Sequence, residues 1–207
     1  MRTKGVPVPL PDCAIHYHLA DKAPFLNLSD LAEPELAVVI SELARRRAES
    51  GLKRIFGQKY IEMRRLTEAR LHDLFVEAGG KPERSTPHYF CLGPCEWFRC
   101  LAPDMRQVVI PLSALPDHVT SFTYPDSFVA MGFGPRFGLP QVARPYHDRA
   151  FRMSQLPEVI RQFGLPNGDA DQEYEGYHRR PFEKFIEIQV WSDEPVGPFR
   201  ASAGVSA

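Results

Sequence analysis

The segment from Phe185 to Trp191 constrains the fold more than any other part of this chain, because its side chains alternate strictly between two faces. One face carries Ile186, Ile188 and Val190, and β-branched residues at this spacing favour a strand packed on a core. The other face carries a carboxylate and an amide between two aromatic rings: Phe185, Glu187, Gln189 and Trp191. This second face predicts the wall of a cleft centred on Glu187. The alternative is an amphipathic strand whose polar side meets water.

Two helices are predicted before the strand-rich half of the chain. Pro34 suits a first helical position and Gly51 a helix end, which predicts a helix over residues 34–50. A second helix is predicted over residues 58–78, ended by Gly79-Gly80. Its apolar face is expected to hold Tyr60, Met63, Thr67, Leu71, Leu74 and Ala78, and its solvent face Glu62, Arg65, Glu68 and Arg70.

The remaining segments predict an α+β fold, in which an N-terminal strand and two helices precede a strand-rich half that forms a central mixed or antiparallel sheet. The first strand is expected over residues 13–19, and no segment close to it in sequence can pair with it. We therefore expect it to pair with the segments around Phe122 or Glu187. Further strands are predicted at 88–92, 107–110, 119–124 and 185–191, a short helix at 153–163, and loops at 132–140 and 166–171.

Length and composition favour one domain. A chain of 207 residues suits a single domain over residues 1–207, with residues 1–12 extended or flexible and residues 196–207 a flexible tail. No apolar run has the length of a signal peptide or a membrane span, which predicts a cytoplasmic protein with no membrane partner. The net charge of −1 argues against a strongly basic nucleic-acid coat but permits a local basic groove.

Three further patterns can carry chemistry. His16 and His18 share one face of a strand and can bind a metal if a third ligand arrives, as in a metal-dependent hydrolase. No second ligand motif accompanies them, so we predict no metal site and expect His18 to bind a ligand or a backbone group. Asp126 follows a strand and is expected to cap the next helix. The cysteines do not have zinc-ribbon spacing and are expected to be free buried thiols: Cys91, Cys95 and Cys100.

The order of these pieces resembles the DNA ADP-ribosylating toxins of the ADP-ribosyltransferase superfamily. In that family an opening strand carries a Tyr-His pair, a helical stretch an arginine pair, and the final strand the catalytic Glu ahead of apolar residues. The corresponding pieces here are Tyr17-His18, Arg64-Arg65, the aromatic strand His88–Gly93, the Asp turn Phe122–Ser127, and the final strand Phe185–Val190. The chain departs from the family pattern where Leu19 follows the histidine and where Cys95-Glu96-Trp97 replaces an Arg-Ser-Pro run.

The resemblance implies a transferase of the glycosyltransferase class that uses NAD as a substrate. It implies Glu187 as the catalytic carboxylate, and the NAD-binding residues would be His18, Arg65, Tyr89 and Tyr124. The acceptor would be a nucleic acid or a protein, beside the nucleotide-type small molecule itself. A non-catalytic binding module is the competing hypothesis, with a partner surface formed by exposed aromatics at 88–90, 97–98, 185 and 191.

Overall fold

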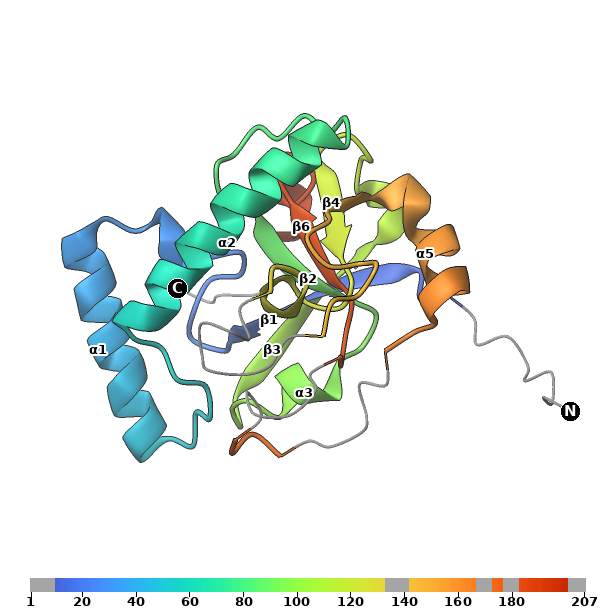
Figure 1. Ribbon diagram of the computed structural model, residues 1–207. Helices are drawn as coiled ribbons and strands as arrows, with labels where there is room; N and C mark the ends of the chain where they lie inside the picture. The colour runs from blue at the N-terminus through green and yellow to red at the C-terminus, as the bar shows by residue number, and fades with distance from the viewer. Residues whose placement is uncertain (1–9, 133–141, 167–172, 177–182, 201–207) are drawn as a thin grey trace, which may run out of the picture.

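The computed structural model describes residues 10–132, 142–166, 173–176 and 183–200 (Figure 1). It confirms the α+β fold: helices lie around a six-stranded sheet ordered β3-β1-β2-β6-β4-β5, in which the strand pairs are antiparallel. The strands are β1 (Cys13–Leu19), β2 (His88–Leu92), β3 (Met105–Pro111), β4 (Thr120–Thr123), β5 (Phe151–Arg152) and β6 (Glu187–Val190). The predicted loops at 132–140 and 166–171 fall almost wholly outside the described residues.

The long helices begin and end within a residue of their predicted bounds. The helices are α1 (Glu33–Glu49), α2 (Gln58–Glu77), α3 (Glu96–Arg99), α4 (Ser127–Ala130), α5 (Leu156–Phe163) and α6 (Gly197–Arg200). Short 3-10 turns occupy Leu28–Asp30, Leu112–Ala114 and Met153–Gln155, so the predicted helix at 153–163 is a 3-10 turn that leads into α5. Gly79 lies at a φ of 85° just after α2, which is the left-handed conformation expected of its stop signal.

The partners of β1 differ from the prediction. They do come from the strand-rich half, but they are β3 and β2 rather than the segments around Phe122 and Glu187. β1 pairs with β3 along its whole length, from Cys13 opposite Pro111 to Leu19 opposite Met105. Its pairing with β2 is short: Ala14 lies opposite Leu92, and Ile15 lies opposite Cys91. The Phe122 and Glu187 segments, β4 and β6, pair with each other instead.

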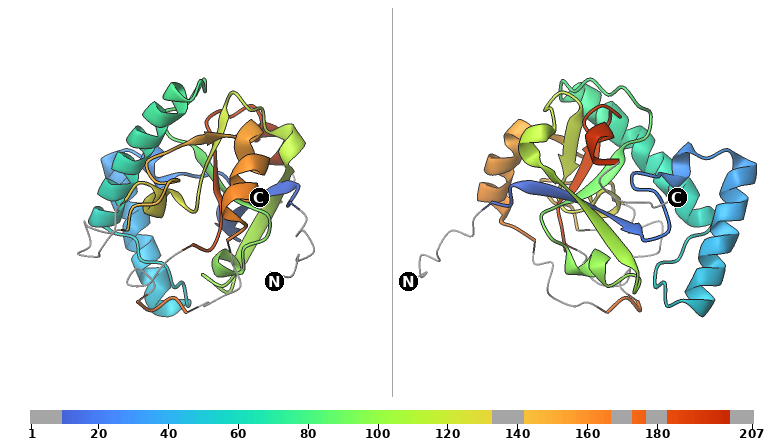
Figure 2. Two further views of the ribbon diagram at one scale, coloured as in Figure 1. Left: turned by 45° about the vertical axis from the view of Figure 1, so that its right-hand side comes forward. Right: turned by 180° about the vertical axis from the view of Figure 1, so that it is seen from behind.

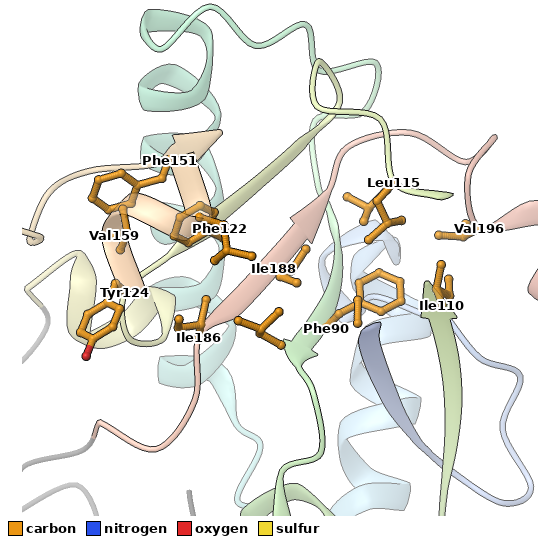
Figure 3. Close-up of a cluster of buried hydrophobic side chains, with 14 of the residues drawn as sticks. Phe90, Ile110, Leu115, Phe122, Tyr124, Phe151, Val159, Ile186, Ile188 and Val196 are labelled. Carbon is orange, nitrogen blue, oxygen red and sulfur yellow. The ribbon is translucent and has the colours of Figure 1, made fainter. Parts of the chain in front are cut away.

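The two faces of the sheet are covered by different helices. On one face Phe90, Phe122 and Ile188 pack with side chains of α5, and Figure 3 shows these residues with Val159 of α5 in one apolar cluster. On the other face Trp191 packs with Leu71, Leu74 and Phe75 of α2. Figure 2 shows α2 and α5 on opposite sides of the sheet. The period-two pattern of Phe185 to Trp191 thus divides the strand between two separate cores.

The buried stripe of α2 includes two charged residues. The prediction was right for Met63, Thr67, Leu71 and Leu74, which are buried. It was wrong for Glu68, which is 2% exposed and does not face solvent. Arg64 is also buried.

The end of the described chain is more ordered than predicted. Val196 is fully buried in the main apolar cluster, and α6 follows it, so residues 196–200 do not form a flexible tail. Among the described helices, none is long and apolar enough to cross a membrane. The cytoplasmic location stays a prediction.

Candidate functional site

A cavity of about 900 Å³ lies where β1 and β2 part. The pairing of these strands ends where Ile15 lies opposite Cys91. Beyond that point a side chain makes the next link between the strands, because Nδ1 of His16 donates to the backbone carbonyl of Tyr89 at 2.8 Å. Small-molecule pockets are commonly about 300 to 1,000 Å³, so the volume suits a nucleotide-sized ligand. The side chains on the wall include Tyr17, His18, Arg54, Arg64, Tyr89 and Glu187.

Glu187 stands at the start of β6 on the cavity wall. Its neighbours across the sheet are Cys91 on β2 and Thr123 on β4, so all three side chains lie on one face. Glu187 is 6% exposed, and its backbone N–H donates to the Pro125 carbonyl at 3.2 Å. The cleft wall predicted around Glu187 is therefore present, and the carboxylate is buried rather than on a solvated strand face.

Arg64 provides a buried positive charge beside this carboxylate. Its guanidinium carbon lies 4.5 Å from the ring centre of Tyr89 and 4.1 Å from that of Phe128. Nη1 donates to Ser127 Oγ at 3.2 Å. Stacking between two rings suits the planar guanidinium and would not suit a lysine.

The charges around Arg64 keep it protonated. Burial is the largest effect and lowers the pKa of the guanidinium, but the nearby Tyr60, Tyr89, Glu187 and Glu68 together raise it well above its ordinary value. A buried charge of this kind requires partners of opposite sign. Arg64 and Glu187 therefore form a pair of opposite charges at the cavity wall.

Glu68 fixes the position of Tyr89. Its Oε1 accepts a hydrogen bond from the Tyr89 hydroxyl and another from Asn27 Nδ2, both at 3.0 Å. Burial, assisted by the charges of Glu68 and Glu187, raises the pKa of the Tyr89 hydroxyl well above its ordinary value. The hydroxyl is therefore a donor at neutral pH, and the ring is held against Arg64.

The two histidines lie on the opposite face of the sheet from Glu187. Because Ile15 is directly opposite Cys91, the alternation along β1 places Tyr17 on the Glu187 face and His16 and His18 on the other. His18 lines the cavity, and its Nδ1 lies 2.9 Å from the Lys22 carbonyl. The strand pairing thus brings His18 and Glu187 to one cavity but not to one side of the sheet.

His16 has a structural role. Its Nδ1 donates to the Tyr89 carbonyl, and its Nε2 accepts from the backbone N–H of Phe25 at 2.9 Å. Burial lowers its pKa to about 4. Both ring nitrogens are engaged, which leaves none for a metal ion. Within the described ranges, no three His, Cys, Asp or Glu side chains are grouped so as to hold a metal.

Arg65 and Tyr124 lie away from the cavity. Arg65 is on the outer face of α2, where Nη1 is 2.5 Å from Oε1 of Glu33. Tyr124 is buried in the core on the α5 side (Figure 3), and its hydroxyl donates to the Phe163 carbonyl at 3.1 Å. Neither is among the described residues that line the cavity. Of the predicted NAD-binding residues, the cavity therefore brings together His18 and Tyr89.

Sequence reasoning chose Arg65, whereas the member of the arginine pair that lines the cavity is Arg64, and a sequence signal for its burial was present. Ile61, Arg64, Glu68, Leu71 and Phe75 follow one another at spacings of three or four residues, which is the pattern of a single buried helix face. Charged residues in such a pattern are either paired in the core or part of a site.

The aromatic residues proposed as a partner surface are mostly inside the molecule. Trp97, Phe185 and Trp191 are buried, as are His88 and Phe90. Phe98 is half-buried, and its ring lies 5.6 Å from that of Tyr17 and 5.0 Å from that of Phe185. Phe98 and Phe185 line the cavity, Phe90 packs in the core on the α5 side, and Trp191 packs against α2. The observation that motivated a non-catalytic binding module is therefore not supported.

The predicted cap at Asp126 is confirmed. Its Oδ1 accepts hydrogen bonds from the backbone N–H groups of Phe128 at 2.9 Å and Val129 at 3.2 Å, at the start of α4. The cysteines are free thiols, and Cys91 and Cys95 are buried as expected, whereas Cys100 is only partly buried.

Comparison with known proteins assigns no family to this site. No protein-family model matches the chain, and neither a curated protein nor a solved structure shows significant similarity to it. The geometry and charges of the cavity are therefore the basis of the functional inference.

Proposed function

We propose that the protein transfers ADP-ribose from NAD to an acceptor, with Glu187 as the catalytic carboxylate. The observation that carries this proposal is the pair of opposite buried charges, Glu187 and Arg64, on the wall of a nucleotide-sized cavity. A planar aromatic side chain, Tyr89, lies beside them. A second cation, Arg54, also lines the cavity. A carboxylate, this cation and an aromatic ring match the ribose, the pyrophosphate and the rings of a dinucleotide.

The reaction requires a carboxylate where positive charge develops. The bond between nicotinamide and ribose breaks with both electrons leaving on the nicotinamide, and the ribose passes through an oxocarbenium-like state. Glu187 stabilises this charge and binds a ribose hydroxyl, because it is already oriented in a site of low polarity. The nucleophile of the acceptor then bonds to the same ribose carbon and gives up its proton.

The remaining cavity residues have complementary roles in this proposal. His18 binds the adenosine ribose and Tyr89 stacks on the nicotinamide, as the resemblance implies. Arg54 lines the cavity, with its guanidinium carbon 5.2 Å from the ring centre of Phe56, and binds the pyrophosphate. Arg64 does not have the NAD-binding role expected of Arg65 and instead holds Tyr89 and Glu187 through stacking and charge. The acceptor stays either a nucleic acid or a protein.

The test is NAD binding and nicotinamide release by the wild-type protein and by Glu187→Gln. Because a preorganised charged group contributes several kcal/mol, the variant should release nicotinamide at least about 100-fold more slowly. Glu194→Gln is the matched control: it makes the same chemical change at an exposed carboxylate outside the cavity, and its rate should equal that of the wild type. Failure to bind NAD at millimolar concentration, or full activity of Glu187→Gln, would refute the proposal.

A further inference from the structure

A chain of buried hydrogen bonds leads from Trp191 to Glu187. Trp191 Nε1–H donates to Ser121 Oγ at 2.8 Å, and the Ser121 hydroxyl donates to Gln189 Oε1 at 3.0 Å. Gln189 Nε2 then donates to Glu187 Oε1 at 3.3 Å. Trp191, Ser121 and Gln189 are fully buried. The register of the sheet creates this chain, because Ser121 on β4 lies directly opposite Gln189 on β6.

The direction of every bond in the chain follows from chemistry. The indole of Trp191 can only donate, so the Ser121 oxygen accepts and its single hydrogen is directed to Gln189. At the other end, the Thr123 hydroxyl donates to the Pro125 carbonyl at 3.3 Å, so its oxygen accepts from Gln189 Nε2 at 3.1 Å. A flipped amide would place Oε1 against the carboxylate of Glu187 and against a hydroxyl oxygen whose hydrogen is already used. Only one orientation of the Gln189 amide satisfies both ends.

The amide donates both of its protons at the Glu187 end. Its Nε2 lies near three acceptors: Thr123 Oγ1, the Glu187 carbonyl at 3.2 Å and the Glu187 side-chain oxygen. The Gln189 side chain therefore binds the backbone and the carboxylate of the same residue, two positions earlier on one face of the strand. This arrangement limits rotation of the Glu187 side chain more than a bond to the carboxylate alone.

We propose that Gln189 is a positioning residue that holds the Glu187 carboxylate in its catalytic orientation, and that Ser121 and Trp191 hold the Gln189 amide in turn. The catalytic meaning of this inference rests on the proposed function, whereas the hydrogen-bond chain rests on the structure itself. A fully buried glutamine destabilises a sheet core unless each of its donors and acceptors has a partner, because an unmade hydrogen bond leaves a buried polar group unsatisfied.

The surroundings of Glu187 explain why a neutral donor is suited to this place. The titratable groups that face it are Arg64 on α2, Tyr89 and Cys91 on β2, and Asp126 before α4. Arg64 attracts the carboxylate, and Asp126 repels it when ionised. The Gln189 amide adds a hydrogen-bond donor on the strand side without adding a second charge that would compete with Arg64.

The principal test is Gln189→Glu, which keeps the shape and the acceptor for Ser121 but replaces the donor with a second carboxylate. We expect kcat for nicotinamide release to fall about tenfold or more, with KM for NAD changed by less than about threefold. The acidic limb of the pH–rate profile should move to higher pH, because the variant places a second negative charge beside the carboxylate at the site. A residue with a merely structural role would not move this limb.

Two further variants complete the design. Gln189→Leu removes the donor without adding charge, and combined with Glu187→Gln it should cause no further loss of kcat, because Gln189 acts through Glu187. Thr120→Val is the matched control, because Thr120 is a fully buried polar residue on the same strand as Ser121 and its side chain lies on the other face. Its Oγ1 has no hydrogen-bond partner within the described part of the chain. This control variant should leave kcat and the pH profile unchanged. Unchanged kcat and pH profile in folded Gln189→Glu and Gln189→Leu would overturn the inference.

An NMR measurement tests the inference even if the wild-type protein releases no nicotinamide or the Gln189 variants fail to fold. In NMR spectra of the wild type and of Glu187→Gln, the side-chain amide protons of Gln189 should differ clearly in chemical shift, because their acceptor has changed. Identical shifts would overturn the positioning role, even if the Gln189 variants fail to fold. A wild-type protein that releases no nicotinamide would refute the proposed function, and the same amide shifts would still decide whether Gln189 holds Glu187.

Discussion

Replacing Asp126 with asparagine should remove a large pH-dependent cost to the stability of the fold. Asp126 is 5% exposed, and its Oδ2 is buried without a hydrogen-bond partner among the residues that the structure describes. Burial, and then the negative charge of Glu187, raise the pKa of this carboxyl from 3.8 to about 7. The two helix-capping bonds to Oδ1 oppose this rise but do not cancel it.

The direction and size of the effect follow from the two pKa values. Below pH 3.8 both the folded and the unfolded chain hold this proton, so Asp126 adds no pH dependence. Between pH 3.8 and about 7 the unfolded chain releases the proton while the folded protein retains it, so stability falls as pH rises. At about 1.4 kcal/mol per unit, the total loss is about 4 kcal/mol, and above pH 7 it stays constant.

The assay is denaturant unfolding of the wild type and Asp126→Asn at intervals from pH 4 to pH 8. Asparagine keeps the Oδ1 acceptor and caps helices as well as aspartate. The variant should therefore gain stability relative to the wild type as pH rises, by about 3 kcal/mol between pH 4 and pH 7. Parallel pH curves for the two proteins would refute this reasoning.

Asp117→Asn is a control of opposite sign. Although burial raises the pKa of Asp117, its hydrogen bonds with Ser154 and Arg152 lower it overall. The folded protein therefore favours the ionised form, and that stabilisation is present above pH 3.8 and is lost as pH falls further. Asp117→Asn should lose stability at neutral pH rather than gain it.

Three further predictions concern the cavity. His16 should stay neutral with its proton on Nδ1 throughout pH 5 to 8. The stability of the fold should fall as pH drops from 6.5 toward about 4, because the unfolded chain takes up the proton first. Imidazole ¹⁵N shifts that titrate near pH 6.5 would contradict this prediction. Tyr89→Phe should lower the free energy of unfolding by about 1 to 3 kcal/mol, because the buried Glu68 carboxylate loses a donor; urea unfolding measures this, and an unchanged midpoint would exclude it. Arg64→Lys should strongly reduce both stability and nicotinamide release. Arg65→Lys, at an exposed ion pair, should change stability by less than about 1 kcal/mol. Equal effects of the two variants in thermal unfolding and in the release assay would show that the wrong arginine has been assigned to the site.

Local patterns were sufficient to predict most of the elements but not how they meet. The alternation of Phe185 to Trp191 and the helix signals at Pro34 and Gly79 depend on neighbours in sequence, and the structure confirms them. The partner of β1 depends on which distant strand covers the most apolar surface, and no local pattern contains that information. The expected pairing with the Phe122 or Glu187 segments failed for this reason.

The same limit applies to the candidate site. Period-two alternation shows that His16 and His18 share a face of one strand and that Glu187 and Gln189 share a face of another. This alternation does not show whether the histidines and Glu187 lie on the same face of the sheet. That depends on which residues of β1 and β6 lie opposite Cys91 of β2, the strand between them. The sequence pattern therefore predicted a cleft at Glu187, whereas the contacts that Arg64 and Gln189 make there depend on the three-dimensional structure.

The strand order has a consequence for synthesis of the protein. β6 lies between β2 and β4 and is the last strand of the described chain, so it joins the β3-β1-β2 half of the sheet to the β4-β5 half. Until the ribosome has made residues 187–190, these two halves have no common strand. Glu187 and Gln189 arrive on the same strand that completes the sheet. A nascent chain that stops earlier therefore has neither a continuous sheet nor the Glu187 carboxylate, and the wall of the cavity is complete only when this strand has joined the sheet.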